Sequence, residues 1–148
     1  MSDSRSAPSR TLQRPPLVVS LLAFYDIVMV GVVPGALMLM QHLSAAPAER
    51  TVLPVFGALL LSAGIVWAAT DAWHGRRWAR VGLMALASVY YVGLAVGAPW
   101  SVDLASLLHV GSSTVAIVLR VGRSLFWIAL HAAILFVLGR RHFEARTS

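Results

Sequence analysis

The residue least expected in its surroundings is Asp26, the one charged residue between Leu17 and Met40. A charged side chain at the centre of a transmembrane helix costs about 2.5–3.5 kcal/mol on insertion scales. An ionisable residue at that depth is therefore a functional hypothesis by default, and it needs a partner. It can bind a proton or an ion, or it can form a hydrogen bond between helices.

His131 is the natural partner for Asp26. Asp26 lies nine residues after Leu17 and His131 lies nine residues before Arg140, so each is about 13 Å from the same side of the membrane. Three more polar side chains fall within about one helical turn of this level on other apolar segments: Tyr90, Ser88 and Ser62. These five residues are our candidate intramembrane polar site. An interhelical hydrogen bond is the plainer role, and such bonds average under about 1 kcal/mol in membrane proteins.

The composition indicates the class of protein to which these residues belong. Of the 148 residues, 58% are hydrophobic and only 12% are charged, and the mean hydropathy is +0.76. The charged share is about half that of an ordinary soluble domain. A soluble domain of this size would expose much of its apolar surface to water. The composition therefore excludes a soluble globular protein and a disordered chain, and it indicates an integral membrane protein.

Four apolar runs, residues 17–40, 52–73, 79–100 and 121–139, are predicted to span the membrane. The first run extends about 36 Å as a helix, against a hydrocarbon core of about 30 Å. A signal peptide cleaved near Ala46-Pro47-Ala48 is the alternative for this run. Signal peptides have apolar cores of about 7–15 residues, which favours an uncleaved span.

The remaining segments complete the predicted fold. Residues 1–16 are expected to be a disordered cytoplasmic tail, and residues 140–148 a basic cytoplasmic tail. Residues 102–119 place leucines such as Leu104 and Leu108 opposite polar residues such as Asp103, which predicts an amphipathic helix in the interface. A fifth span is the alternative there. The predicted fold is an all-α integral membrane protein, a four-transmembrane-helix bundle with an interfacial amphipathic helix before the last span.

The net charge of +6 is a topology signal. All twelve basic residues are Arg, and nine of them lie in residues 1–16, 71–80 and 140–148. Each of these segments has a net charge of +2, so together they account for the whole net charge. With four spans they share one side of the membrane, and the positive-inside rule places both termini in the cytoplasm. Five spans would divide the Arg residues less asymmetrically. We therefore expect no nucleic acid partner, although the sequence pI is about 11.3.

The inner edge of the membrane is expected to carry the lipid contacts. Five Arg residues are assigned to anionic headgroups: Arg76, Arg77, Arg80, Arg140 and Arg141. Asp71 is expected to pair with Arg76 or Arg77 at this edge. For that reason we expect Asp26→Asn to alter activity or assembly more than Asp71→Asn.

Two glycine pairs have the GxxxG spacing of closely packed membrane helices. Gly31 and Gly35 lie in the first run, and Gly93 and Gly97 lie at the same depth in the third. They predict close packing of the first span against the third, or a homodimer, with chance spacing as the alternative. Pro34 is expected to kink the first span and to free a carbonyl.

The sequence offers no motif for catalysis. It contains no Cys, and the HExxH, GxSxG and phosphate-loop patterns are absent. A bis-His haem needs two deep His residues and an intramembrane aspartyl protease needs two deep Asp residues, and the spans offer one of each. We expect no catalytic residue, no metal and no cofactor.

Two classes of function remain. A Pro-bounded first span, the GRRWAR turn and a basic tail are typical of small multi-span bacterial membrane proteins, which indicates the bacterial inner membrane. The favoured function is an accessory subunit, assembly factor or scaffold that binds a protein partner, or a second copy, through its spans. The alternative is a proton-coupled carrier or small oligomeric channel that uses the Asp26–His131 pair. Four spans leave little room for a substrate path, which favours the first.

Overall fold

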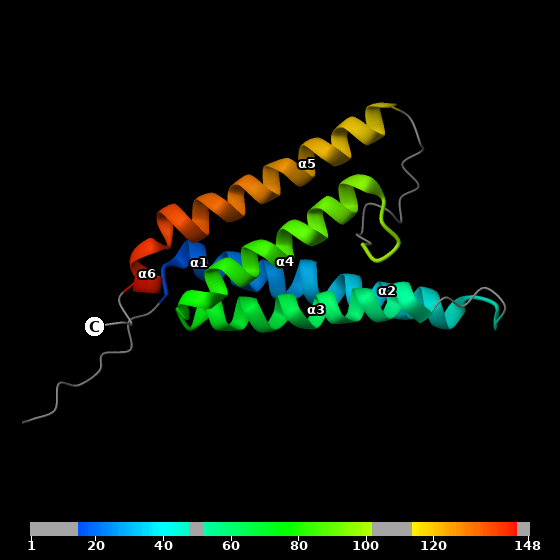
Figure 1. The fold of residues 1–148 in the computed structure, drawn as a ribbon, viewed down its shortest axis with the longest axis horizontal. Helices are drawn as coiled ribbons and strands as arrows, with labels where there is room; N and C mark the ends of the chain where they lie inside the picture. Colours follow the sequence, from blue (N-terminus) through cyan, green and yellow to red (C-terminus); the bar gives the residue numbers. More distant parts are fainter. Residues whose placement is uncertain (1–14, 48–51, 102–113, 145–148) are drawn as a thin grey trace, which may run out of the picture.

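The computed structural model describes residues 15–47, 52–101 and 114–144, and every regular element in these ranges is a helix. Four helices are long and apolar enough to cross a membrane: Leu17–Ser44, Val52–Trp73, Arg77–Val96 and Thr114–Leu138. The all-helical fold with four such helices is confirmed. The helices run alternately in opposite directions (Figure 1).

The first and last of these helices are not regular. The first consists of α1 (Leu17–Tyr25), a π-helical segment η1 (Asp26–Val32) and α2 (Val33–Ser44). The last consists of α5 (Thr114–Ala132) and a second π-helical segment η4 (Ala133–Leu138), and it is followed by α6 (Arg140–Glu144). The middle two, α3 (Val52–Trp73) and α4 (Arg77–Val96), are continuous α-helices.

Glycine sets the ends of α3 and α4. Gly75 and Gly97 have φ values of 71° and 70°, in the left-handed region that glycine adopts without strain. After each of them the chain closes the helix with backbone hydrogen bonds, Arg76 to Asp71 at 3.0 Å and Ala98 to Gly93 at 2.8 Å. This Schellman arrangement satisfies the last carbonyls of a helix. It ends the third span at Val96, four residues before the predicted end.

The last span begins earlier than predicted. Its helix starts at Thr114, so residues 114–119 of the predicted interfacial segment belong to the same helix as the span itself. The rest of that segment, residues 102–113, lies outside the described residues. The predicted tails also fall mostly outside them, except that residues 140–144 form α6.

Alanine, aliphatic and aromatic side chains form the core between the four spans. Ala68, Ala69 and Ala72 of α3 and Ala79 and Ala87 of α4 are almost fully buried. Large apolar side chains on the outer faces of all four helices are exposed, as a surrounding of lipid would allow. Figure 1 shows α2 beside α3 and α4 beside α5, with α1 and α6 at one end.

Candidate functional site: a buried Asp–His pair between the first and last spans

The structure brings Asp26 and His131 into direct contact, although 105 positions separate them in the chain. The His131 Nε2 atom lies 2.9 Å from one Asp26 carboxyl oxygen and 3.1 Å from the other. Both side chains have 0% exposure. The equal-depth argument from the sequence thus places the two residues where the structure has them, at one level of the bundle.

The second ring nitrogen of His131 fixes the orientation of its ring. Nδ1 lies 2.8 Å from the carbonyl oxygen of Trp127, one turn earlier on α5. A carbonyl oxygen can only accept a hydrogen bond, so Nδ1 is the donor and carries a hydrogen. Nε2 therefore points across to Asp26 with its ring held in place by its own helix, as is usual for functional His residues.

Aromatic rings enclose the pair. The rings of Tyr25 and Trp127 stack with centroids 4.5 Å apart, which joins the residue before Asp26 to α5. Tyr91 of α4 meets the His131 ring edge to face at 5.6 Å and lies nearly parallel to Trp127 at 6.2 Å. Stacked and edge-to-face pairs of this kind contribute about 0.5–1.5 kcal/mol each beyond burial. The site is therefore both dry and tightly positioned.

A π-helical segment follows each member of the pair. Asp26 is the first residue of η1, and His131 lies two residues before η4. A π segment widens the helix, is rare, and occurs frequently at functional sites. Pro34 lies two residues after the end of η1 and has no N–H to continue an α-helical ladder there. In η4 the N–H of Gly139 bonds the Ile134 carbonyl at 2.7 Å, five residues back.

Gly139 lets the first and last spans approach closely at this end. A Cβ atom there would lie 2.9 Å from Val19 of α1 and 2.8 Å from the Ile134 carbonyl. Neither distance leaves room for a side chain. The Asp26–His131 pair, the Tyr25–Trp127 stack and Gly139 therefore form one line of contact between the two spans.

The other predicted members of the polar site are placed differently. Tyr90 is buried on α4 and meets Tyr91 edge to face at 5.3 Å, beside the pair. Ser88 is half-buried on the same helix. Ser62 does not join the pair, because its hydroxyl faces the position of Gly35. The residues that sequence reasoning missed are Tyr25, Tyr91 and Trp127. Their positions in the sequence could have indicated them: Tyr25 precedes Asp26, Tyr91 follows Tyr90, and Trp127 lies one turn before His131.

The glycine pairs do not pack the first span against the third. Cβ atoms at Gly31 and Gly35 would lie 2.6 Å from Val66 and 2.9 Å from Ser62, so both glycines face α3. Gly93 instead lies against Trp100 and Ser101, beyond the end of its own helix. Gly97 ends α4, where Arg120 lies nearby. The predicted packing of the first span against the third is wrong, because equal depth does not specify which helices are neighbours. The homodimer alternative stays a prediction.

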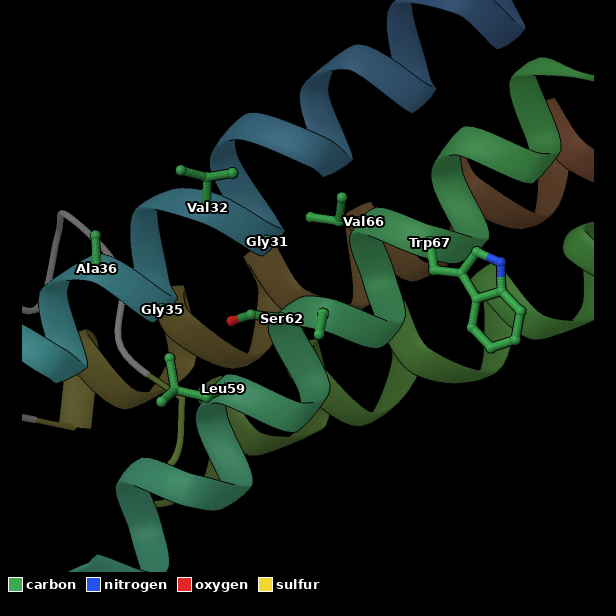
Figure 2. Close-up of a pocket in the computed structure, with 9 residues that line it drawn as sticks. Gly31, Val32, Gly35, Ala36, Leu59, Ser62, Val66 and Trp67 are labelled. Carbon is green, nitrogen blue, oxygen red and sulfur yellow. The ribbon is translucent and has the colours of Figure 1, made fainter.

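Gly31 and Gly35 help to form an open groove of about 470 Å³ between the first span and α3 (Figure 2). Four of its lining residues besides Ser62 have no side chain or only a methyl group. They are Gly31, Gly35, Ala36 and Ala63. Larger apolar side chains border them: Val32, Leu59, Val66 and Trp67. Figure 2 shows the Ser62 side chain directed from α3 toward the first span.

The end of the bundle formed by the α3–α4 turn and α6 carries the Arg residues that the sequence assigns to lipid headgroups. Arg76 bonds Asp71 at 3.3 Å, so the predicted pairing of Asp71 is confirmed. Arg140 donates to Glu144 at 2.8 Å, and this bond lowers the pKa of the Glu144 carboxyl from its ordinary value. The Arg80 guanidinium lies over the Phe136 ring at 5.0 Å. Arg77 and Arg141 are exposed.

No known protein family, curated protein or solved structure matches the chain. Within the described ranges, His, Asp and Glu side chains form no group of three that could hold a metal ion. The site consists of a carboxyl and an imidazole that share a hydrogen bond in an apolar, aromatic enclosure.

Proposed function

We propose that the chain is an accessory subunit, assembly factor or scaffold of the bacterial inner membrane that binds a transmembrane helix of a partner protein. The groove between the first span and α3 supports this proposal. Its lining residues lie in the middle of two apolar helices, so an occupant must itself lie in the bilayer. Small side chains let a second helix approach closely, which favours a helix over a lipid chain as the occupant.

Capture of the full chain in mild detergent, followed by mass spectrometry, tests this role. Ala63→Phe would fill the groove, while Ala85→Phe adds the same ring to an exposed position on α4. We expect a stoichiometric membrane partner to copurify with the wild type and with Ala85→Phe, and to be lost with Ala63→Phe. Recovery of only a second copy, or equal recovery with both variants, would contradict the proposal.

We also propose that both termini lie in the cytoplasm. The contact of His142 with the carbonyls of Ala72 and Trp73, each at 3.3 Å, supports placing the α3–α4 turn and α6 at one end. Each of these segments is rich in Arg, and such segments remain on the cytoplasmic side. A fluorescent protein fused to either terminus should fluoresce, and a periplasmic phosphatase fused there should be inactive. The opposite pattern would reverse the orientation.

A second function, a proton-coupled carrier or small oligomeric channel, is favoured by one observation. The Asp26–His131 pair is fully buried and hydrogen-bonded at the level where such proteins hold a proton. In liposomes this function predicts a homo-oligomer with a pH-dependent ion flux that Asp26→Asn abolishes. Absence of flux from the wild type would remove this candidate and leave the accessory role unaffected.

A further inference from the structure

The hydrogen bonds of His131 determine how many protons the buried pair holds. Nδ1 carries one hydrogen, because it donates to the Trp127 carbonyl. The 2.9 Å contact between Nε2 and the Asp26 carboxyl needs a second hydrogen between the two atoms. This proton sits either on the carboxyl group or on Nε2. In both arrangements the pair has two protons and no net charge, which suits a site with 0% exposure.

Loss of one proton breaks the arrangement, whichever proton leaves. If Nδ1 keeps its hydrogen, the lone pair of Nε2 faces a carboxylate. If the hydrogen moves to Nε2, the lone pair of Nδ1 faces the Trp127 carbonyl oxygen. Each case leaves two electron-rich atoms in contact away from water, where unsatisfied polar groups are costly. The deprotonated pair is therefore incompatible with the packing of α5 against η1.

We propose that the Asp26–His131 pair is a proton-binding site whose second proton fastens the first span to the fourth. Release of that proton to water lets the two spans separate, and its return closes them. Because the closed state binds one proton more than the open state, raising the pH shifts the population toward the open state. This coupling goes beyond the accessory role and does not depend on it.

Within the described residues, the side chains around the pair do not supply another carboxyl or imidazole group that could respond to pH in its place. The other titratable groups facing it are phenols, Tyr25 from α1 and Tyr91 from α4, with Tyr90 beside Tyr91. α3 contributes apolar side chains such as Ile65 to the core around the pair. The carboxyl group of α3, Asp71, is bonded to Arg76 at the inner end.

The two π segments give the spans a way to move. A π turn holds one residue more than an α-helical turn, so its conversion to α-helix rotates the following residues by about 100°. Both segments lie next to the pair, on the two helices that it joins. Local helix irregularities of this kind can absorb a change that rigid helices cannot.

Distance measurements between two spin labels test the proposal directly. The chain has no Cys, so Met40→Cys and Val118→Cys introduce labels at two exposed positions, on α2 and α5. We expect the labelled full chain in lipid nanodiscs to show one narrow distance distribution at low pH. A longer population should appear as the pH rises and should disappear again when the pH is lowered.

Asp26→Asn is the decisive variant. The amide N–H of Asn donates to the lone pair of Nε2, so the bridge persists with no proton to lose. We expect this variant to keep the low-pH distance distribution at every pH at which the wild type is folded by circular dichroism. Asp71→Asn, the matched change at the inner end, should behave as the wild type. A wild-type distance that does not change with pH, or an equal change in Asp26→Asn, would overturn the proposal.

Discussion

Asp26 and Asp71 are both buried carboxyl groups, but their partners differ in kind. Asp71 meets an Arg76 side chain that is 60% exposed, so water and salt screen this pair. Asp26 meets an imidazole with no exposure at all, and both groups depend on each other for their hydrogen bond. Removing one partner of a fully buried pair leaves the other unsatisfied, which is the larger cost.

This difference predicts a ranking of stabilities. Asp26→Ala should lower the free energy of unfolding by about 1–2 kcal/mol, because Nε2 of His131 loses its partner. Asp26→Asn should stay within about 0.5 kcal/mol of the wild type, since the amide restores that bond. Asp71→Ala should cost less than about 1 kcal/mol. Thermal unfolding in detergent measures all three, and equal losses for Asp26→Asn and Asp26→Ala would contradict the hydrogen-bond argument.

Two buried serines offer a second test at this scale. The Ser101 hydroxyl donates to the Ala98 carbonyl at 2.9 Å. The Ser124 hydroxyl is buried on α5 and has no hydrogen-bond partner among the described residues. A buried unsatisfied hydroxyl costs about 1–3 kcal/mol. Ser124→Ala should therefore raise the melting temperature and Ser101→Ala should lower it. A fall in both variants would show that Ser124 is satisfied in the membrane.

At the scale of helices, the sequence predicts where each helix lies in the chain better than it predicts which helices pack against each other. Hydropathy locates all four spans, and the second, residues 52–73, has the bounds that the structure shows. A rise of 1.5 Å per residue also places Asp26 and His131 at one depth, and in the structure they meet. One extra residue in a turn changes this calculated depth by little, so the π segments do not invalidate the estimate.

Other features of the helices depend on information that composition and depth do not contain. The π segments arise from local backbone hydrogen bonding, in the first span beside Pro34. Gly31 and Gly35 face α3 because of the order in which the helices pack around the core. The aromatic enclosure also depends on which helices are neighbours, because Tyr91 of α4 and Trp127 of α5 reach the site from different helices.

The packing of the first span on α3 predicts a strong dependence on glycine. A Cβ atom at Gly31 would lie 2.6 Å from the Val66 side chain, whereas one at Gly57 would meet nothing within 4 Å. Gly31→Leu should therefore lower the free energy of unfolding by about 1–3 kcal/mol through overpacking. Gly57→Leu on α3 is the matched control and should be close to neutral. Similar losses in the two variants would contradict the argument, because helix propensity favours Leu over Gly at both positions and only the contact with Val66 distinguishes them.

At the scale of the whole molecule, charge and apolar surface are arranged along one axis. The four apolar helices form the middle, and the Arg residues of the α3–α4 turn and of α6 lie at one end, where α1 begins (Figure 1). Such a distribution orients a membrane protein and also attracts anionic lipids to one leaflet. The high pI follows from the Arg residues of these segments.

This arrangement predicts selective stabilisation by anionic lipid. Arg77 and Arg141 are exposed, and each is worth about 1 kcal/mol of attraction to an anionic surface. Replacing both by Gln should therefore weaken binding of anionic lipid by roughly ten- to thirtyfold. The affinity is measured by lipid titration of the detergent-solubilised full chain, with melting temperature as the readout.

The matched control, Arg120→Gln with Arg123→Gln on α5, should retain the wild-type response because these residues lie toward the other end of the spans. Added salt should reduce the response of the wild type, since screening acts on exposed charges. Equal loss in both double variants would show that net charge alone, and not its position, attracts the lipid.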